Sequence, residues 1–83
     1  MTITLRYFAA LRETLGRDRE EMELGAAMRI GDLRTLLATR EPTLAPLLAR
    51  CVAARNHTFA DDATPLVDGD EVAFIPPMAG GAS

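Results

Sequence analysis

The clearest regular element in this sequence is an amphipathic helix at residues 30 to 40. Its apolar residues recur at helical spacing and would form one stripe: Ile30, Leu33, Leu36 and Leu37. Asp32 in the first turn and Arg40 in the last would each interact favourably with the helix dipole, and Pro42 would end the helix. A helix with a single apolar face has to pack against another layer, and we expect that layer to be a sheet.

The segment before this helix alternates with the period of a strand. In residues 2 to 8, Ile3, Leu5 and Tyr7 would share one face, and Phe8 would fall on the opposite face. The first three are expected in the core. For Phe8 the alternation leaves two interpretations open, because its ring could pack under the next helix or form an exposed contact for a partner.

The remaining segments are short. Residues 9 to 15 favour a helix that ends at Gly16, and residues 17 to 23 favour an edge strand in a hairpin with the first strand. After the main helix we expect a loop or 3₁₀ turn at residues 43 to 48 and a strand at residues 50 to 55. A turn at residues 56 to 57 would join that strand to a brief strand at residues 58 to 60. A polar loop at residues 61 to 64 and a final strand at residues 72 to 75 would follow. The predicted class is α+β, with one main helix on one face of a mixed sheet.

Composition narrows the classes of function. A chain of 83 residues forms one domain, and its apolar fraction of 48% is typical of globular proteins. A net charge of −3 argues against a general nucleic-acid partner, and no apolar run is long enough to cross a membrane. All nine basic residues are arginine, which excludes lysine-based Schiff-base chemistry on this chain. The single cysteine forms no internal disulfide, and we expect a cytoplasmic protein.

No side chains form an evident catalytic or metal site. Cys51 is interpreted as a buried, inert thiol in an apolar strand, and His57 as a turn residue without a histidine partner for a metal. The paired acids lack the spacing of a calcium loop and are interpreted as solvated turn residues: Asp61, Asp62, Asp68, Asp70 and Glu71.

The end of the chain has a composition of its own. A turn at Asp68-Gly69-Asp70 leads into the last strand, which Pro76 and Pro77 end because neither can donate a backbone hydrogen bond. Gly80 and Gly81 follow and would pass through a narrow channel without steric hindrance. The glycines alone are more typical of a frayed terminus.

Residues 68 to 81, DGDEVAFIPPMAGG, resemble the C-terminal signature of the small subunits of molybdopterin synthase, which are ubiquitin-like sulfur carriers. Residues 8 to 16, FAALRETLG, resemble the opening FAxxRExxG of that family. The resemblance implies a β-grasp domain at residues 1–75 and an extended tail at residues 76–83. It also implies that the first and last strands lie side by side in parallel at the centre of the sheet, which would bring Phe8 close to Ile75.

The resemblance also implies the chemistry. A ubiquitin-activating-type adenylyltransferase would use ATP and Mg²⁺ to adenylate the carboxyl of Gly81, which sulfur would convert to a thiocarboxylate. The tail (Pro76, Pro77, Met78, Ala79 and Gly80) would enter the large subunit of the synthase and deliver sulfur to cyclic pyranopterin monophosphate. This chain would bind no cofactor and would not be catalytic alone. Phe8, Phe59 and Ile75 would contact the large subunit in a heterotetramer with two large subunits at its centre.

One feature departs from the pattern, since Ala82 and Ser83 follow the glycine pair. While they are attached, the carboxyl of Gly81 is an amide and cannot be adenylated. A tail-trimming protease could remove them, they could be absent from the native chain, or the carrier could be inactive. Two other functions stay open: a sulfur carrier for thiamine, cysteine or another thiolated product, and a β-grasp interaction module without covalent chemistry.

Overall fold

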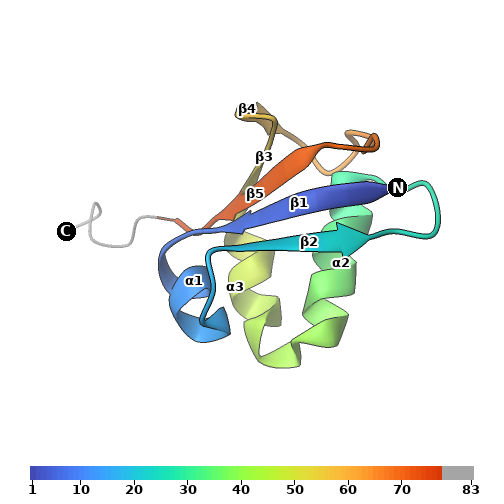
Figure 1. Ribbon diagram of the computed structural model, residues 1–83. Helices are drawn as coiled ribbons and strands as arrows, with labels where there is room; N and C mark the ends of the chain where they lie inside the picture. The colour runs from blue at the N-terminus through green and yellow to red at the C-terminus, as the bar shows by residue number, and fades with distance from the viewer. Residues whose placement is uncertain (78–83) are drawn as a thin grey trace.

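The computed structural model describes residues 1–77, which form one mixed sheet with helices on one of its faces (Figure 1). The sheet has five strands in the order β2-β1-β5-β3-β4. The strands are β1 (Thr2–Tyr7), β2 (Arg19–Glu23), β3 (Val52–Arg55), β4 (Thr58–Ala60) and β5 (Glu71–Ile75). The helices are α1 (Ala9–Leu15), α2 (Ile30–Arg40), the 3₁₀ helix η1 (Pro42–Leu44) and α3 (Ala45–Arg50).

The first and last strands form the centre of the sheet. β1 and β5 are parallel, with Leu5 opposite Val72 and Tyr7 opposite Phe74, and every other pair of neighbouring strands is antiparallel. The predicted α+β class, the hairpin of β1 and β2 around α1 and the central parallel pair are therefore confirmed. The chain starts at one end of the sheet and leaves β5 at the other (Figure 1).

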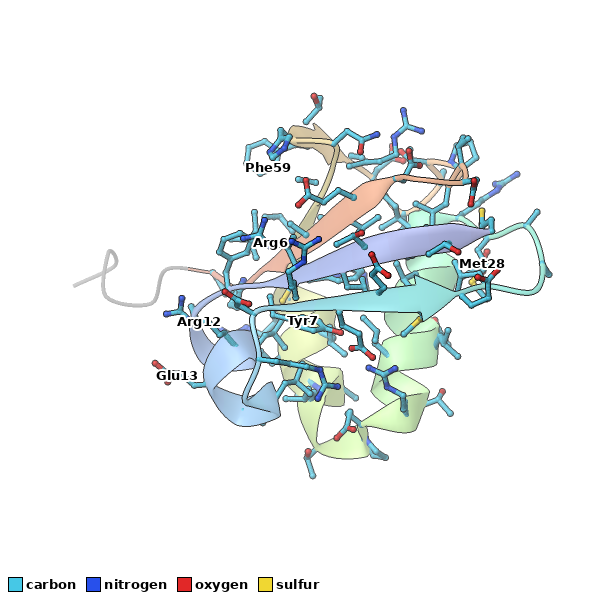
Figure 2. All side chains as sticks on the ribbon, viewed as in Figure 1. Arg6, Tyr7, Arg12, Glu13, Met28 and Phe59 are labelled. Atoms are coloured by element: carbon cyan, nitrogen blue, oxygen red, sulfur yellow. The ribbon has the colours of Figure 1, made fainter. Side chains whose placement is uncertain are left out.

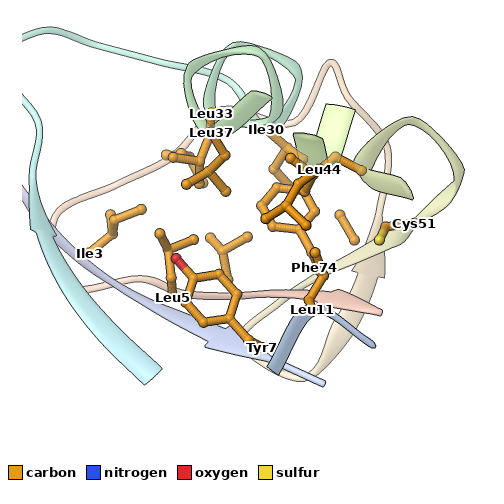
Figure 3. Close-up of a cluster of buried hydrophobic side chains, with 14 of the residues drawn as sticks. Ile3, Leu5, Tyr7, Leu11, Ile30, Leu33, Leu37, Leu44, Cys51 and Phe74 are labelled. Atoms are coloured by element: carbon orange, nitrogen blue, oxygen red, sulfur yellow. The ribbon is translucent and has the colours of Figure 1, made fainter. Parts of the chain in front are cut away.

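The core lies between the sheet and the helices (Figure 3). Alternate residues of β1 and β5 supply one side and the stripe of α2 supplies the other: Ile3, Leu5, Tyr7, Val72, Phe74, Ile30, Leu33 and Leu37, each at most 3% exposed. Burying a side chain of this size contributes about 1.5–3 kcal/mol. The apolar face of the helix is thus the one predicted, except that Leu36 lies at its margin and is only partly buried.

The predicted 3₁₀ turn is confirmed at its start by η1, but the prediction is wrong for residues 45 to 48, which belong to the helix α3. Pro42 and Pro46 lie in the first turns of η1 and α3, where a proline needs no backbone N–H and its fixed φ suits a helix. Leu44 and Leu48 are four residues apart and both buried, so they hold this segment on the core. The predicted strand at residues 50 to 55 starts two residues late, at Val52.

The predicted turns are confirmed by positive φ angles. Gly16 ends α1 with φ 74° and donates its N–H to the carbonyl of Arg12, and Gly69 has φ 87°. Asn56 and His57 join β3 to β4 with φ 51° and 71°. Ala9 also has a positive φ of 49°, which costs a non-glycine residue roughly 1–2 kcal/mol. The chain reverses there from β1 into α1.

A polar cluster ties the edge strand β2 to the end of α2. The hydroxyl of Tyr7 donates to Glu20 (2.7 Å), and both Nη atoms of Arg40 donate to the same carboxylate (2.9 and 3.1 Å). Burial opposes ionisation of Glu20, but the hydrogen bonds from Arg40 and Tyr7 outweigh it and lower its pKa. Burial, together with the hydrogen bond to Glu20, raises the pKa of Tyr7. The cluster therefore joins a carboxylate, a guanidinium and a neutral phenol.

Candidate functional site

The face of the sheet opposite the helices, here called the open face, has side chains facing away from the core. The strand registers place Arg6, Ala73, Ala54 and Phe59 in one row across β1, β5, β3 and β4. Figure 2 shows Arg6 and Phe59 on the side of the sheet away from the helices. The row has the large side chains of Arg6 and Phe59 at its ends and two alanines between them, so the surface is depressed in the middle of the row.

This row contains a depression of about 210 Å³, here called the hollow. Its lining comes from four strands and the adjoining turns: Arg6, Phe8, Ala54, His57, Phe59, Glu71, Ala73 and Ile75. Phe8 and Phe59 are 38% and 75% exposed. Of the two interpretations of Phe8, an exposed ring is therefore correct, and a ring packed under the next helix is not. The hollow brings together the three residues for which a partner contact was predicted, Phe8, Phe59 and Ile75.

The polar wall of the hollow is made of the side chains of Arg6, Glu71 and His57. Nη1 of Arg6 donates to one oxygen of Glu71 (3.1 Å), and Nε2 of His57 lies 3.2 Å from the other. The guanidinium of Arg6 also lies over the ring of Phe8, 5.8 Å from its centre. Glu71 was predicted in a solvated turn, which is wrong: it is the first residue of β5, and Arg6 and Glu71 meet because β1 and β5 are neighbours.

The hollow lies where the chain leaves the sheet. Since Tyr7 is opposite Phe74, the next residues, Phe8 and Ile75, follow at the same end of the central strands. Pro76 is buried and Pro77 is exposed. The other residues predicted in the tail, Met78, Ala79, Gly80 and Gly81, together with Ala82 and Ser83, lie outside the described residues.

Cys51 is 5% exposed, as predicted, although it follows α3 and precedes β3 instead of lying in a strand. Its thiol donates to the carbonyl of Leu47 (3.3 Å), and burial raises its pKa although Arg34 and Arg50 act in the opposite direction. A thiol that stays protonated is a poor nucleophile.

The paired acids have structural roles. Asp61 accepts from the N–H of Ala63 within its own turn, and Asp68 accepts from the N–H of Thr2 (2.7 Å). Asp62 pairs with the guanidinium of Arg34 (2.9 Å). The same guanidinium donates to the carbonyls of Leu48 and Cys51. Arg34 therefore ties α2 to the loop that contains Asp62 and to the end of α3.

Asp70 is the most buried of these acids, at 7% exposed. It accepts from the N–H of Val67 (2.8 Å) and from the side-chain amide of Asn56 (2.9 Å), so it closes the turn before β5. The predicted turn roles of Asp61, Asp68 and Asp70 are confirmed, but Asp70 is buried instead of solvated and Asp62 pairs with a helix residue. Within residues 1–77, no three His, Cys, Asp or Glu side chains come together as metal ligands, and no helix is long and apolar enough to span a membrane.

Known proteins are similar to this chain in sequence and in fold. The model of the ThiS family matches residues 5–81, and the chain belongs to that family. It is 40% identical over 80 residues to the "Molybdopterin synthase sulfur carrier subunit" of Mycobacterium tuberculosis, covering 95% of this chain and 96% of that protein. It is 39% identical over 83 residues to the protein of the same name from Chlamydomonas reinhardtii, covering 98% and 100%.

Solved structures agree in fold. SAMP1 from Haloferax volcanii superposes with a TM-score of 0.81 at 24% identity, covering 98% of this chain and all of that one. A chain in the "Protein-protein complex of subunit 1 and 2 of Molybdopterin-converting factor" from Helicobacter pylori superposes with a TM-score of 0.71 at 27% identity, covering 98% and 100%. The predicted ubiquitin-like β-grasp fold is confirmed.

Proposed function

We propose that this chain is the sulfur-carrying small subunit of a molybdopterin synthase. The observation that carries the proposal is its end-to-end similarity to two proteins of that name, at 39% and 40% identity. The structure supports the proposal because the chain leaves the sheet at the end of the central strand β5, beside an exposed apolar hollow. Function on this account divides between a tail, residues 76–83, and a docking face.

The reacting group is the main-chain carboxyl of Gly81. Its oxygen attacks the α-phosphorus of ATP in the active site of an adenylyltransferase, with Mg²⁺ on the phosphates, and pyrophosphate leaves. Hydrosulfide, at the sulfide oxidation level, then attacks the acyl carbon and displaces AMP, and a thiocarboxylate forms at Gly81. Within the large subunit, the thiocarboxylate sulfur attacks a carbon of cyclic pyranopterin monophosphate and displaces an oxygen substituent, which gives a thioester to Gly81. Water then hydrolyses this thioester, so the sulfur stays on the pterin and the carboxylate of Gly81 is restored. ATP and Mg²⁺ act in the activating enzyme, and this chain binds neither.

The open face docks on the large subunit. Phe8, Phe59 and Ile75 border the hollow, and exposed aromatic residues of this kind often dominate the binding energy of an interface. The Helicobacter pylori complex of subunits 1 and 2 supports a partner of this class. We propose a cytoplasmic heterotetramer with two large subunits at its centre, in which the large subunits supply the catalytic side chains.

The two residues after Gly81 have to be removed before the first step. Ala82 and Ser83 keep the carboxyl of Gly81 in an amide bond. We propose that a protease trims them.

A second candidate in the same chemical class is a sulfur carrier for thiamine, cysteine or another thiolated product. The match to the ThiS family model over residues 5–81 favours a sulfur carrier without fixing its pathway. A third candidate is a β-grasp module that binds a partner without covalent chemistry.

Two experiments separate these candidates. Affinity capture with the chain as bait should retain a molybdopterin synthase large subunit; capture of a thiazole synthase or a cysteine synthase instead would favour the second candidate. A variant that lacks Gly80 and Gly81 should fail to restore cofactor synthesis in a deficient host. Full restoration by that variant would contradict both carrier functions and favour the third.

A further inference from the structure

The hollow has the size of a site for a single ring. Its volume of about 210 Å³ exceeds the roughly 150 Å³ of an engineered protein cavity that binds benzene. Its depth comes from Ala54 and Ala73, which lie directly opposite each other on β3 and β5. A larger residue at either position would fill it.

The two sides of the hollow are aromatic. Phe8 follows the end of β1 and Phe59 lies on the edge strand β4, so the rings border the hollow from opposite sides of the row. With 38% and 75% of their surface exposed, they leave large apolar areas in water. Exposed aromatic surface around a concave site is typical of a binding surface and not of a solvent-facing one.

Arg6 contributes a planar guanidinium to the wall of the hollow. Its guanidinium is fixed on one side by the ring of Phe8, at 5.8 Å, and by the hydrogen bond to Glu71. A planar guanidinium stacks on the face of an aromatic ring, and an aliphatic side chain has no such face. Because Glu71 already pairs with Arg6, an apolar ring could cover this wall without leaving an unpaired buried charge.

We propose that the hollow receives one aromatic side chain from the large subunit, which packs on Ala54 and Ala73 and stacks against Arg6. This inference rests on the proposed function, because it takes the large subunit as the partner. The inserted ring would lie beside Ile75, next to the point where the chain leaves the sheet. It would therefore fix the direction in which the tail enters the partner.

The test measures the dissociation constant between the full chain and its large subunit for matched variants. Ala73→Leu fills the hollow and should weaken binding on the order of 30-fold. Ala27→Leu adds the same side chain at an exposed position in the loop between β2 and α2, at the other end of the sheet, and should bind as the wild type does. Arg6→Lys keeps the charge without the planar group and should weaken binding roughly three- to tenfold. Thermal unfolding of each variant shows that the fold is kept.

The partner's ring is found by replacing each exposed Phe, Tyr and Trp of the large subunit with Ala. One of these replacements should weaken binding to the wild-type chain strongly and to the Ala73→Leu variant only slightly, because the two changes remove the same contact. Wild-type affinity of a folded Ala73→Leu variant, beside a Phe8→Arg variant that fails to bind, would overturn the aromatic insertion and leave the docking face in place. Absence of binding by the wild-type chain would contradict the proposed function itself.

Discussion

The two faces of the sheet differ in what their side chains do. On the covered face, Leu5, Val72 and Phe74 have no exposed surface and pack against the helices. On the open face, Phe8 and Phe59 remain exposed around a hollow. Because successive residues of a strand point to opposite faces, one short sequence specifies both surfaces. We therefore expect that neighbouring substitutions can change stability and docking separately.

The largest expected effect comes from replacing a phenylalanine on the covered face. Phe74→Ala removes a side chain with no exposed surface and should lower the free energy of unfolding by about 3–5 kcal/mol. Phe59→Ala is the matched change on the open face, where the ring is 75% exposed, and should lower it by less than about 0.5 kcal/mol. Urea denaturation compares the two. Equal losses would mean that the two faces do not differ as described.

A charge on the open face should have the opposite pattern. Phe8→Arg should leave the unfolding transition nearly unchanged but weaken binding to the large subunit by about 2 kcal/mol or more, because it places a charge where an apolar contact is expected. Calorimetric titration measures the affinity. Unchanged affinity would remove Phe8 from the docking face.

The polar cluster at the margin of the covered face should give a moderate, pH-dependent effect. The pKa of Glu20 is lower in the folded chain than its ordinary value, so its contribution to stability is present above that value and is lost as the pH falls through the folded pKa. Glu20→Gln should lower the free energy of unfolding at pH 7 by about 1 kcal/mol and reduce the loss of stability below about pH 4.3.

The control for this variant is Glu21→Gln, on the same strand at an exposed position. It should keep the pH dependence of the wild type. Denaturation midpoints between pH 3 and 7 give the comparison, and identical pH profiles for Glu20→Gln and the wild type would contradict a stabilising role of the Glu20 carboxylate.

The smallest effect on stability is expected at Ala9, where the chain turns from β1 on the sheet into α1. Ala9 has a φ of 49°, which glycine adopts without strain. Ala9→Gly should therefore raise the free energy of unfolding by less than about 1 kcal/mol, since relief of strain is partly offset by the greater freedom of glycine in the unfolded chain. A clear loss of stability would show that the angle is not strained.

The sequence predicted regular elements well where apolar periodicity was strong. Both bounds of α1 and α2 were predicted, because Gly16 and Pro42 mark where these helices stop. The helix α3 was missed because it is short and carries a proline in its first turn, so its apolar spacing extends over little more than one turn. How far a segment is buried against the core depends on tertiary packing, which a local sequence pattern does not predict.

The candidate site was predictable only in part. The resemblance named Phe8, Phe59 and Ile75, and the structure brings these residues to one hollow. Ala54 and Ala73 were not predicted as part of a site, because two alanines form a depression only when the strand register places them opposite each other. For Gly81, which lies outside the described residues, the role as sulfur carrier stays a prediction.

The most direct test of this role is the intact mass of the chain purified from the cells that produce it. A sulfur carrier of this kind should end at Gly81, with one carboxyl oxygen replaced by sulfur, and its mass should shift when the thiocarboxylate is alkylated. A chain that keeps Ala82 and Ser83 and gains no sulfur under conditions of active cofactor synthesis would contradict this role.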